Sequence, residues 1–417
     1  MVRSARSVHA MTAMTSLSRP LAPTRPPLLS RALLIRFVSI LGASASFYLM
    51  LSVVPLYARS AGASTNLAGL TTTALSLSTT AGYLPTPRLV ARYGHRPVLA
   101  AGLLLLGAPA LALLVSANLT VIMTVCVVRG IGFAIICVSG GALTASLIPA
   151  QRRGEGLALV GLVSGIPSVA GLSAGVWFAG HYGFRLVFAA AGLAALLPLL
   201  SIPSLPGLNA GAPSEADAAA GGGAGSGMLA GLRTAAVVRP AVIFGMTTMA
   251  AGIFVTFLPL AATHSTANLV ALALGVQPAA SVGGRWLAGR CGDRRSAAGR
   301  SVDGLLVPGV LVTAAGVALL SMHAAPAAVV GGAVLFGIGC GITQNVSLTV
   351  MYNQVPESGY SMVSAVWNLA YDAGMGAGAA TFGLLAARTG YPVGFLLTAL
   401  VLPAPLILIA RRARRPV

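Results

Sequence analysis

The segment from Ser361 to Gly378 carries one acidic side chain, Asp372, within an otherwise apolar and glycine-rich run. With the apolar residues that follow, it is long enough to cross a bilayer, which takes about 20 residues. A charged side chain near the bilayer centre costs at least about 2.5–3.5 kcal/mol. Ser364 and Asn368 precede Asp372 at helical spacing, and such a polar stripe has to face protein or water rather than lipid.

Two roles are open for Asp372. Loss of hydration at the midplane favours the neutral form of a carboxyl group, so the side chain could take up and release a proton during transport. It could instead be a structural hydrogen-bonding or ion-pairing group that holds its helix against a neighbour. The chain has seven acidic residues, and the others fall in loops or at helix ends. We interpret Asp372 as the titratable centre of a membrane transporter and keep the structural role as the alternative.

Amide and aromatic side chains gather in two apolar segments near Asp372. They are Gln344, Asn345, Trp367, Asn368 and Tyr371. Amides hydrogen-bond to polar groups of a ligand, and aromatic rings form the wall of a binding pocket. Hydrogen bonds between helices are the alternative role of the amides. We expect these side chains to line a substrate cavity.

The composition indicates which elements hold these side chains. Hydrophobic residues make up 56% of the 417 residues and charged residues 8%, and the mean hydropathy is +0.88. Soluble domains carry about 25% charged residues, so the sequence predicts an all-α protein that crosses a membrane many times. Apolar spans are expected at 33–57, 65–86, 97–116, 119–147, 156–179, 186–205, 238–260, 267–289, 302–322, 325–352, 361–386 and 391–410.

These twelve spans divide into two groups of six. We expect a disordered tail at 1–31, a six-helix bundle at 32–206, a linker at 207–236, a second six-helix bundle at 237–410 and a short tail at 411–417. The linker is rich in glycine, alanine and serine and has no periodic pattern, which is typical of a flexible connection.

The distribution of arginines predicts the orientation. An even number of spans places both termini on one side, and that side holds most of the arginines. The opposite side holds Arg59, Arg185 and Arg388, while Arg36 and Arg129 fall within spans. Positive charge marks the cytoplasmic side. We expect a multi-pass protein of the cell membrane with both termini in the cytoplasm.

The two halves repeat at an offset of 207 residues, as from Gly130 to Gly337. The other matched pairs are Gly132 and Gly339, Gly171 and Gly378, Gly183 and Gly390, and Phe188 and Phe395. Internal duplication is typical of transporters and predicts a substrate site near the midplane, between the repeats. At the same offset Asp372 falls on Gly165, so one half has a glycine where the other has the carboxylate.

Enzymatic and nucleic-acid-binding functions lack the residues that they need. The chain has no phosphate-binding Gly-x-x-x-x-Gly-Lys loop and no spaced cluster of His, Asp and Glu. The net charge of +19 is distributed between the spans and forms no basic face with interleaved aromatic residues. The cysteines have no metal-ligand spacing. We expect no catalytic residue, cofactor, metal or nucleic acid, and an ion or substrate gradient as the energy source.

Short motifs resemble those of the major facilitator superfamily. The loop 89–96 is similar to the family signature between helices 2 and 3, with Ala91 at the family's aspartate position, and a related loop follows in the second half. The resemblance implies that these loops latch the cytoplasmic face, the first-half latch being the weaker because Ala91 cannot pair. The implied gating residues are Arg92, Gly94, Arg96, Asp293 and Arg294.

Two further spans carry similar motifs. Arg129 resembles the arginine of the family's fourth helix, which in proton-coupled members influences the coupling carboxylate. The span 156–179 resembles the glycine–proline motif of antiporters, in which glycines allow close helix packing and proline kinks the helix. Its motif residues are Gly161, Gly165, Pro167 and Gly171. Family position also implies that Tyr48 and Phe254 line the substrate cavity.

The resemblance implies a fold and a function class. The fold is twelve membrane helices in two pseudo-symmetric six-helix bundles that rock about a central site. The implied function is secondary active transport of a small organic compound by alternating access. Proton-coupled efflux by a monomer in the lipid bilayer is the first hypothesis. The alternative is a permease or facilitator that takes up a sugar, carboxylate or similar nutrient. A non-transporting sensor or scaffold is a third reading.

Overall fold

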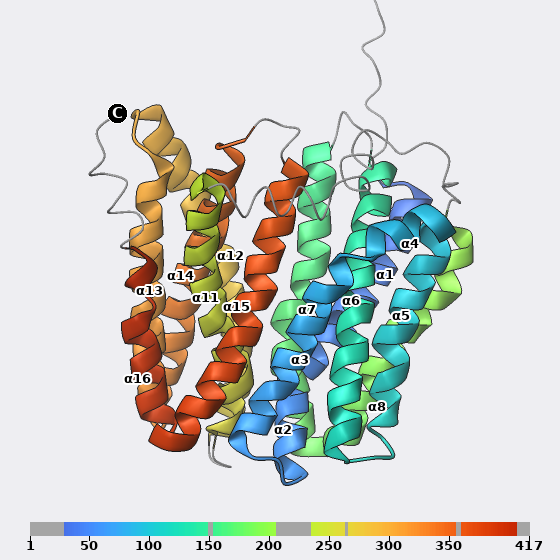
Figure 1. Ribbon diagram of the computed structural model, residues 1–417, viewed down its shortest axis with the longest axis horizontal. Helices are drawn as coiled ribbons and strands as arrows, with labels where there is room; N and C mark the ends of the chain where they lie inside the picture. The colour runs from blue at the N-terminus through green and yellow to red at the C-terminus, as the bar shows by residue number, and fades with distance from the viewer. Residues whose placement is uncertain (1–28, 149–152, 206–234, 263–265, 356–359, 407–417) are drawn as a thin grey trace, which may run out of the picture.

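The computed structural model describes residues 29–148, 153–205, 235–262, 266–355 and 360–406 (Figure 1). Most of the predicted linker and of both predicted tails lies outside these ranges, and the first two residues of α11 (Ala235–Leu260) fall within the predicted linker. The side chain of Asp293 and the surroundings of Gly161 also lie outside the described part of the structure.

The regular elements of the described residues are helical. The first half contains α1 (Arg31–Leu51), α2 (Val53–Ser60), α3 (Thr65–Tyr83), α4 (Thr86–Tyr93), α5 (His95–Ala112), α6 (Leu119–Leu147), α7 (Arg153–Tyr182), α8 (Phe184–Leu196) and η2 (Leu197–Ser204). The second half contains α11 (Ala235–Leu260), α12 (Ala267–Ala297), η3 (Val302–Leu305), α13 (Leu306–Leu319), η4 (Leu320–Met322), α14 (Pro326–Tyr352), α15 (Tyr360–Thr389), α16 (Tyr391–Val401) and η6 (Ala404–Leu406). Each predicted span coincides with one helix or with consecutive helices.

The predicted all-α membrane fold is confirmed. Nine stretches of the described residues are helices long and apolar enough to cross a bilayer. The three remaining predicted spans correspond to α3, α15 and the short α16, so the count of twelve spans stays a prediction. The helices of each half gather side by side in Figure 1, the first half on the right and the second on the left.

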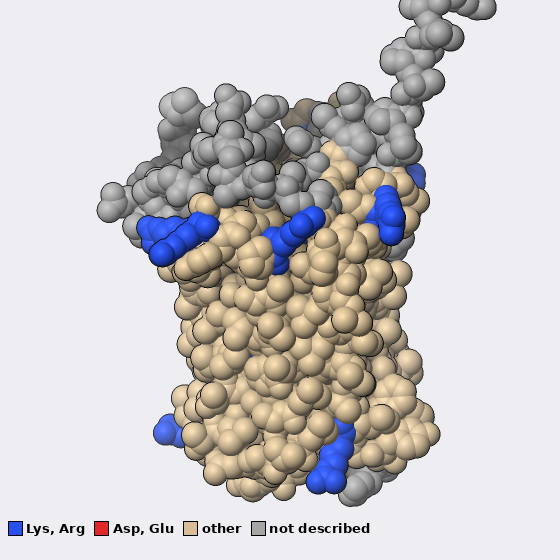
Figure 2. All heavy atoms as spheres, turned by 90° about the vertical axis from the view of Figure 1, so that its right-hand side faces the viewer, with Lys and Arg blue, Asp and Glu red and all other residues tan. Residues whose placement is uncertain are grey.

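Charge is confined to the two ends of the molecule on the face that Figure 2 shows. Arginine side chains lie near the upper and the lower rim, and the broad belt between them carries no charged side chain on this face. An uncharged belt between charged rims is the surface that a bilayer requires. We call the end with the start of α15 the upper end, and the end with the turn from α15 to α16 the lower end.

The internal repeat is visible in the backbone. Gly183 separates α7 from α8 with φ 83° and ψ 167°, and Gly390 separates α15 from α16 with φ 77° and ψ 167°. A positive φ favours glycine because it has no Cβ, so the repeat keeps glycine at this turn in both halves.

Helix packing repeats as well. Gly132 of α6 approaches the carbonyl of Gly102, and Gly339 of α14 approaches the carbonyl of Gly309, one pair in each half at the offset of 207 residues. The second helix of each half follows an offset of 202 residues instead, because Gly82 of α3 and Gly284 of α12 pack against Ile131 and its equivalent Ile338. The two halves are therefore copies of one bundle, with five residues more between Gly284 and Gly309 than between Gly82 and Gly102.

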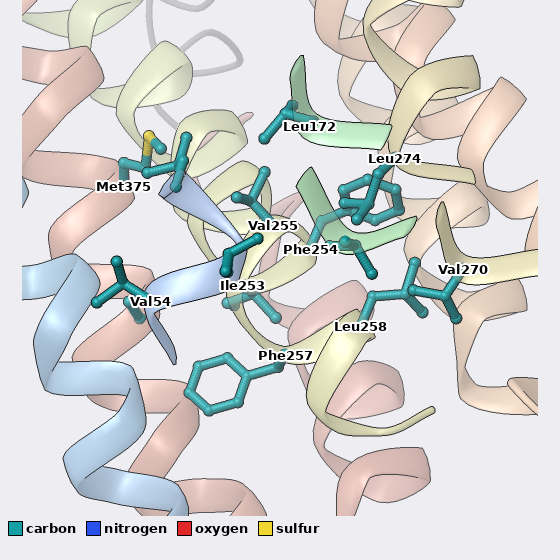
Figure 3. Packing of buried hydrophobic residues seen from close by; sticks show 14 of the residues in the cluster. Val54, Leu172, Ile253, Phe254, Val255, Phe257, Leu258, Val270, Leu274 and Met375 are labelled. Atoms are coloured by element: carbon teal, nitrogen blue, oxygen red, sulfur yellow. The ribbon is translucent and has the colours of Figure 1, made fainter. Parts of the chain in front are cut away.

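An apolar seal joins the halves towards the lower end. Figure 3 shows Val54 and Leu172 of the first half facing side chains of α11, α12 and α15, among them Ile253, Leu274 and Met375. Burial of such side chains releases about 25 cal/mol per Å² of apolar surface, and the seal excludes water from this end.

Polar contacts reinforce this closure. The hydroxyls of Thr72 and Thr256 hydrogen-bond across the halves at 2.8 Å and are both buried. Thr73 donates to the carbonyl of Gly376 at 2.9 Å. This bond belongs to a contact line between α3 and α15. A second contact line between the halves runs between α7 and α12, where an added Cβ on Gly275 would come within 3.1 Å of Ser173. The lower end is closed along both lines.

The halves separate towards the upper end. On α7, Ile166 is 55% exposed, and on α12, Trp286 is 63% exposed. An added Cβ on Gly165 or on Gly283 would meet nothing within 4 Å. The structure is therefore closed at the lower end and open between α7 and α12 at the upper end.

Candidate functional site

Asp372 lies on α15 where it meets α3 of the other half. The hydroxyl of Tyr83 donates a hydrogen bond of 2.8 Å to Oδ2 of Asp372. Asp372 is 7% exposed, and among the described residues it has no ion-pair partner. The site therefore contains a buried carboxyl group whose only described hydrogen-bond donor comes from the opposite bundle. Burial of an unpaired carboxylate is costly, and a proton on the group removes that cost.

Two more hydroxyls and a thiol lie around Asp372. Tyr48 of α1 and Tyr371 of α15 both lie close enough to Asp372, and to each other, to interact electrostatically. Cys137 of α6 interacts with Asp372 in the same way, and it is exposed although it lies in the middle of a long helix. The cluster thus brings together α1, α3 and α6 of the first half with α15 of the second.

Arg285 supplies a positive charge at the same depth. It lies within the apolar stretch Ala267–Gly292 of α12, and its side chain is exposed. Arg285 interacts electrostatically with Tyr48 and Tyr371, the two tyrosines that also interact with Asp372. The central cluster, as we call it, consists of Tyr48, Tyr83, Cys137, Arg285, Tyr371 and Asp372.

The predicted amide and aromatic group is partly brought to this cluster. Tyr371 belongs to it, while Trp367 stacks on Phe244 at 4.5 Å between ring centroids and donates from Nε1 to Ser347 at 3.2 Å. Asn368 is exposed and donates to the carbonyl of Ser364 on its own helix. Trp367 therefore has packing and hydrogen-bonding partners inside the second half.

The amides of α14 are half-buried. The side-chain oxygen of Gln344 is buried and has no hydrogen-bond partner among the described residues. Gln344 lies one turn from Cys340, which interacts electrostatically with Arg285, so it shares the face of α14 that points towards the cluster. Asn345 follows it on the helix and is half-buried. Their contact with a substrate stays a prediction.

Arg129 lies apart from Asp372. It is 3% exposed in the middle of α6, and its guanidinium donates to the carbonyls of Ser46 at 2.9 Å and Leu106 at 2.5 Å. These bonds tie α6 to α1 and α5 within the first half, and Arg129 also lines a small cavity of about 20 Å³. Backbone carbonyls therefore solvate the charge of Arg129 inside the first half. A role in proton coupling stays a prediction, and the structure brings the two side chains into no direct contact.

Phe254 belongs to the seal and not to the open space. It is 1% exposed, and its ring lies 5.2 Å from that of Phe336 (Figure 3 shows Phe254 among the seal residues). The expectation that Phe254 lines the cavity is not met in this conformation, because the halves are closed where it lies. Tyr48, predicted on the same grounds, does lie in the central cluster.

The predicted gating loops lie at the upper end. Arg92 is exposed and its guanidinium lies 5.3 Å from the ring centroid of Tyr93. Gly94 separates α4 from α5 with φ 81°, the conformation that explains glycine there. Arg96 is half-buried, and its Nε has no hydrogen-bond partner among the described residues. Arg294 is exposed at the end of α12. A latch between halves stays a prediction.

The glycine–proline motif of α7 divides into two parts. Gly171 packs on α1, where an added Cβ would lie 2.9 Å from Cβ of Tyr48, so close packing is confirmed there. The prediction that Gly165 also packs against a helix is wrong for this conformation, because the halves have already separated at its level. Pro167 lies buried between these two levels, inside the helix.

Sequence reasoning missed Tyr83, Cys137 and Arg285. Tyr83 ends its helix and Cys137 is one of several apolar-span cysteines, so neither stands out by type. Arg285 lies within the predicted span 267–289, but an arginine near a span end is ordinarily read as part of a loop. Alignment of Gly82 with Gly284 makes Arg285 the repeat equivalent of Tyr83, and this alignment is the signal that could have found it.

Comparison with known proteins agrees with the helical membrane fold. The sequence profile of the Major Facilitator Superfamily matches residues 36–302. No curated protein matches the chain by sequence.

Solved structures of transporters share the fold. The chain is similar to a POT family transporter in complex with 5-aminolevulinic acid, at 14% identity, a TM-score of 0.74 and coverage of 91% of this chain and 96% of that one. It is similar to the peptide transporter POT in complex with sulfate, at 15% identity, a TM-score of 0.73 and coverage of 93% and 96%. The nucleoside transporter NupG has 12% identity, a TM-score of 0.71 and coverage of 93% and 100%.

Proposed function

The chain belongs to the major facilitator superfamily and is a multi-pass membrane transporter, and we propose that it couples the movement of a small organic compound to protons by alternating access. Asp372 carries the proton in this proposal, and the central cluster holds the compound. The upper end is the cytoplasmic end, as the arginine distribution predicts, so the conformation described here is open to the cytoplasm.

The hydrogen bond between Tyr83 and Asp372 is the observation that carries the proposal. It links a donor of one half to the acid of the other. When the halves rock, this contact and the surrounding water change together. The proton affinity of the carboxyl group then differs between the two conformations, and such a difference is what coupling requires.

Two directions of transport are candidates. Efflux in exchange for protons is supported by the glycine–proline motif of α7, with Gly171 packed against α1. Uptake of a compound together with protons is the second candidate. Arg285 favours a compound that carries a carboxylate, because a cation in the central cluster attracts an anion.

Flux in proteoliposomes tests the coupling. The probe is the compound that most raises the melting temperature of the purified chain in a metabolite screen. Asp372→Asn mimics the protonated acid, so we expect it to keep exchange of the compound across the membrane and to lose accumulation driven by a pH gradient. Asp303→Asn, which changes an acid outside the cluster, is the matched control and should retain both.

The same vesicles report the direction. Accumulation driven by an inward proton gradient indicates symport, and accumulation driven by an outward gradient indicates antiport. Undiminished gradient-driven accumulation by Asp372→Asn would remove this residue from the coupling mechanism.

A further inference from the structure

The repeat relates Arg285 to Tyr83. Gly82 and Gly284 are equivalent because they pack against Ile131 and Ile338, which are related by the offset of the halves. The next residue on α3 is Tyr83, and the next on α12 is Arg285. Arg285 therefore occupies on α12 the place from which Tyr83 reaches across to the other half.

The repeat also relates the residues that these two side chains face. Tyr83 donates to Asp372 of α15, and the equivalent of Asp372 on α7 is Gly165. The two contact lines are equivalent too. Gly275 of α12 faces Val169 of α7, and the equivalent residues Thr73 of α3 and Gly376 of α15 face each other in the other line. The second contact line thus has a donor, Arg285, but no acceptor on the helix opposite.

The place of the missing acceptor is open. An added Cβ on Gly165 would meet nothing within 4 Å. Among the described residues, none accepts a hydrogen bond from Arg285, although it lies at membrane depth. A guanidinium with five donors and a permanent charge is the side chain best suited to bind a carboxylate through two parallel hydrogen bonds.

We propose that the transported compound is an organic anion whose carboxylate binds Arg285 in the space beside Gly165, where it completes the contact that Asp372 makes with Tyr83 in the other line. This inference rests on the proposed transport function and names its substrate class. Tyr48 and Tyr371, which interact electrostatically with Arg285, flank the carboxylate and give the body of the compound two aromatic walls.

The proposal has a consequence for coupling. Arg285 and Asp372 both interact electrostatically with Tyr48 and Tyr371, so an anion held between these two tyrosines is close enough to Asp372 for the charge of the acid to affect its binding. A protonated Asp372 leaves the cluster with the positive charge of Arg285 alone, which favours an anion. Proton and anion then assist each other's binding, and this reciprocity predicts that they move in the same direction.

Thermal stabilisation of the purified full-length chain tests the proposal. The probes are sodium benzoate and sodium lactate, each paired with its neutral amide, benzamide or lactamide, at equal ionic strength set with sodium chloride. We expect the two acids to raise the melting temperature and the two amides to leave it unchanged. Inorganic phosphate and methanesulfonate show whether other oxyanions share the site.

Variants of α12 assign the effect to Arg285. Arg285→Gln should weaken binding of the acids roughly tenfold or more, and Arg285→Lys should restore part of it because it keeps the charge. Arg290→Gln is the matched control, since Arg290 lies on the same helix with its guanidinium 4.9 Å from the ring centroid of Trp286. Arg285 is exposed, so its replacement leaves no cavity in the core.

Three results would overturn the proposal: equal stabilisation by the amides, no stabilisation by either acid, or an undiminished response in Arg285→Gln. Asp372→Asn separates this proposal from the proposed coupling. It should bind the acids at least as tightly as the wild type, because it removes a negative charge from the cluster. Loss of gradient-driven flux with retained acid binding is the result that both proposals predict for this variant. Undiminished gradient-driven flux would refute the coupling proposal, and loss of acid binding would refute the proposal of an anion site at Arg285.

Discussion

Replacement of two glycines on α7 by leucine should have opposite consequences. At Gly171 the new Cβ would lie 2.9 Å from Cβ of Tyr48 and 3.3 Å from the backbone nitrogen of Leu49. Overpacking of this kind costs about 1–3 kcal/mol, and we expect Gly171→Leu to lower the melting temperature of the purified protein. At Gly165 nothing lies within 4 Å, so Gly165→Leu should melt as the wild type does.

The cost at Gly165 arises in the other conformation. Closure of the upper end brings α7 towards the exposed side chain of Val282 and the bare backbone of Gly283 on α12. A leucine at 165 would then be overpacked by a similar 1–3 kcal/mol, which reduces the population of the upper-closed state by about 5- to 150-fold. We expect Gly165→Leu to insert into the membrane, fold and fail to transport.

Spin labels at Ala91 and Ala297, two exposed positions at the upper end, measure this population as the distance between the halves, in a background whose cysteines are replaced by serine. The distance distribution of Gly165→Leu should keep only its longer component, whereas Gly171→Leu should retain both. The reasoning is refuted if Gly165→Leu transports at the wild-type rate, or if the melting temperature falls by the same amount in both variants.

Three further variants test other contacts. Tyr83→Phe keeps the ring and removes the hydrogen bond to Asp372, so we expect the ratio of gradient-driven flux to exchange to fall about tenfold, and an unchanged ratio would contradict a coupling role. Thr72→Val should weaken the lower seal by about 1 kcal/mol, which faster thiol labelling of this end would show. This loss of stability should be smaller when Thr256→Val is added, because no hydroxyl is then left unpaired. Arg129→Gln should lower the melting temperature but keep the flux ratio, since its bonds hold α6 to α1 and α5; the opposite pattern would support a coupling role.

The sequence alone predicts the helices and the repeat because both depend on local composition. A run of apolar residues has to form a helix in a bilayer, and glycines such as Gly132 and Gly339 recur wherever two backbones touch. Asp372 is predictable for a related reason, since an acid inside an apolar span stands out by type.

The partners of Asp372 are not predictable in the same way. Tyr83 is recognisable only once α3 is packed on α15, which is a contact between distant segments. Arg285 is concealed by the five-residue difference in offset, because the offset of 207 residues aligns it with Ser78 and not with Tyr83. Gly165 was expected to pack because glycine in a membrane helix usually does. Whether another helix lies beside Gly165 depends on the conformation of the whole transporter.

The two contact lines between the halves are related by the repeat and differ in chemistry. In one line a neutral donor, Tyr83, donates to the acid of α15. In the other line the repeat places the cation Arg285 on α12 and Gly165 on α7 at the equivalent positions. Both charges belong to the second half, so a single rigid-body motion against the first half changes the surroundings of both at once. Coupling of proton and substrate then needs no chain of intermediate residues, because each site biases the same rocking equilibrium.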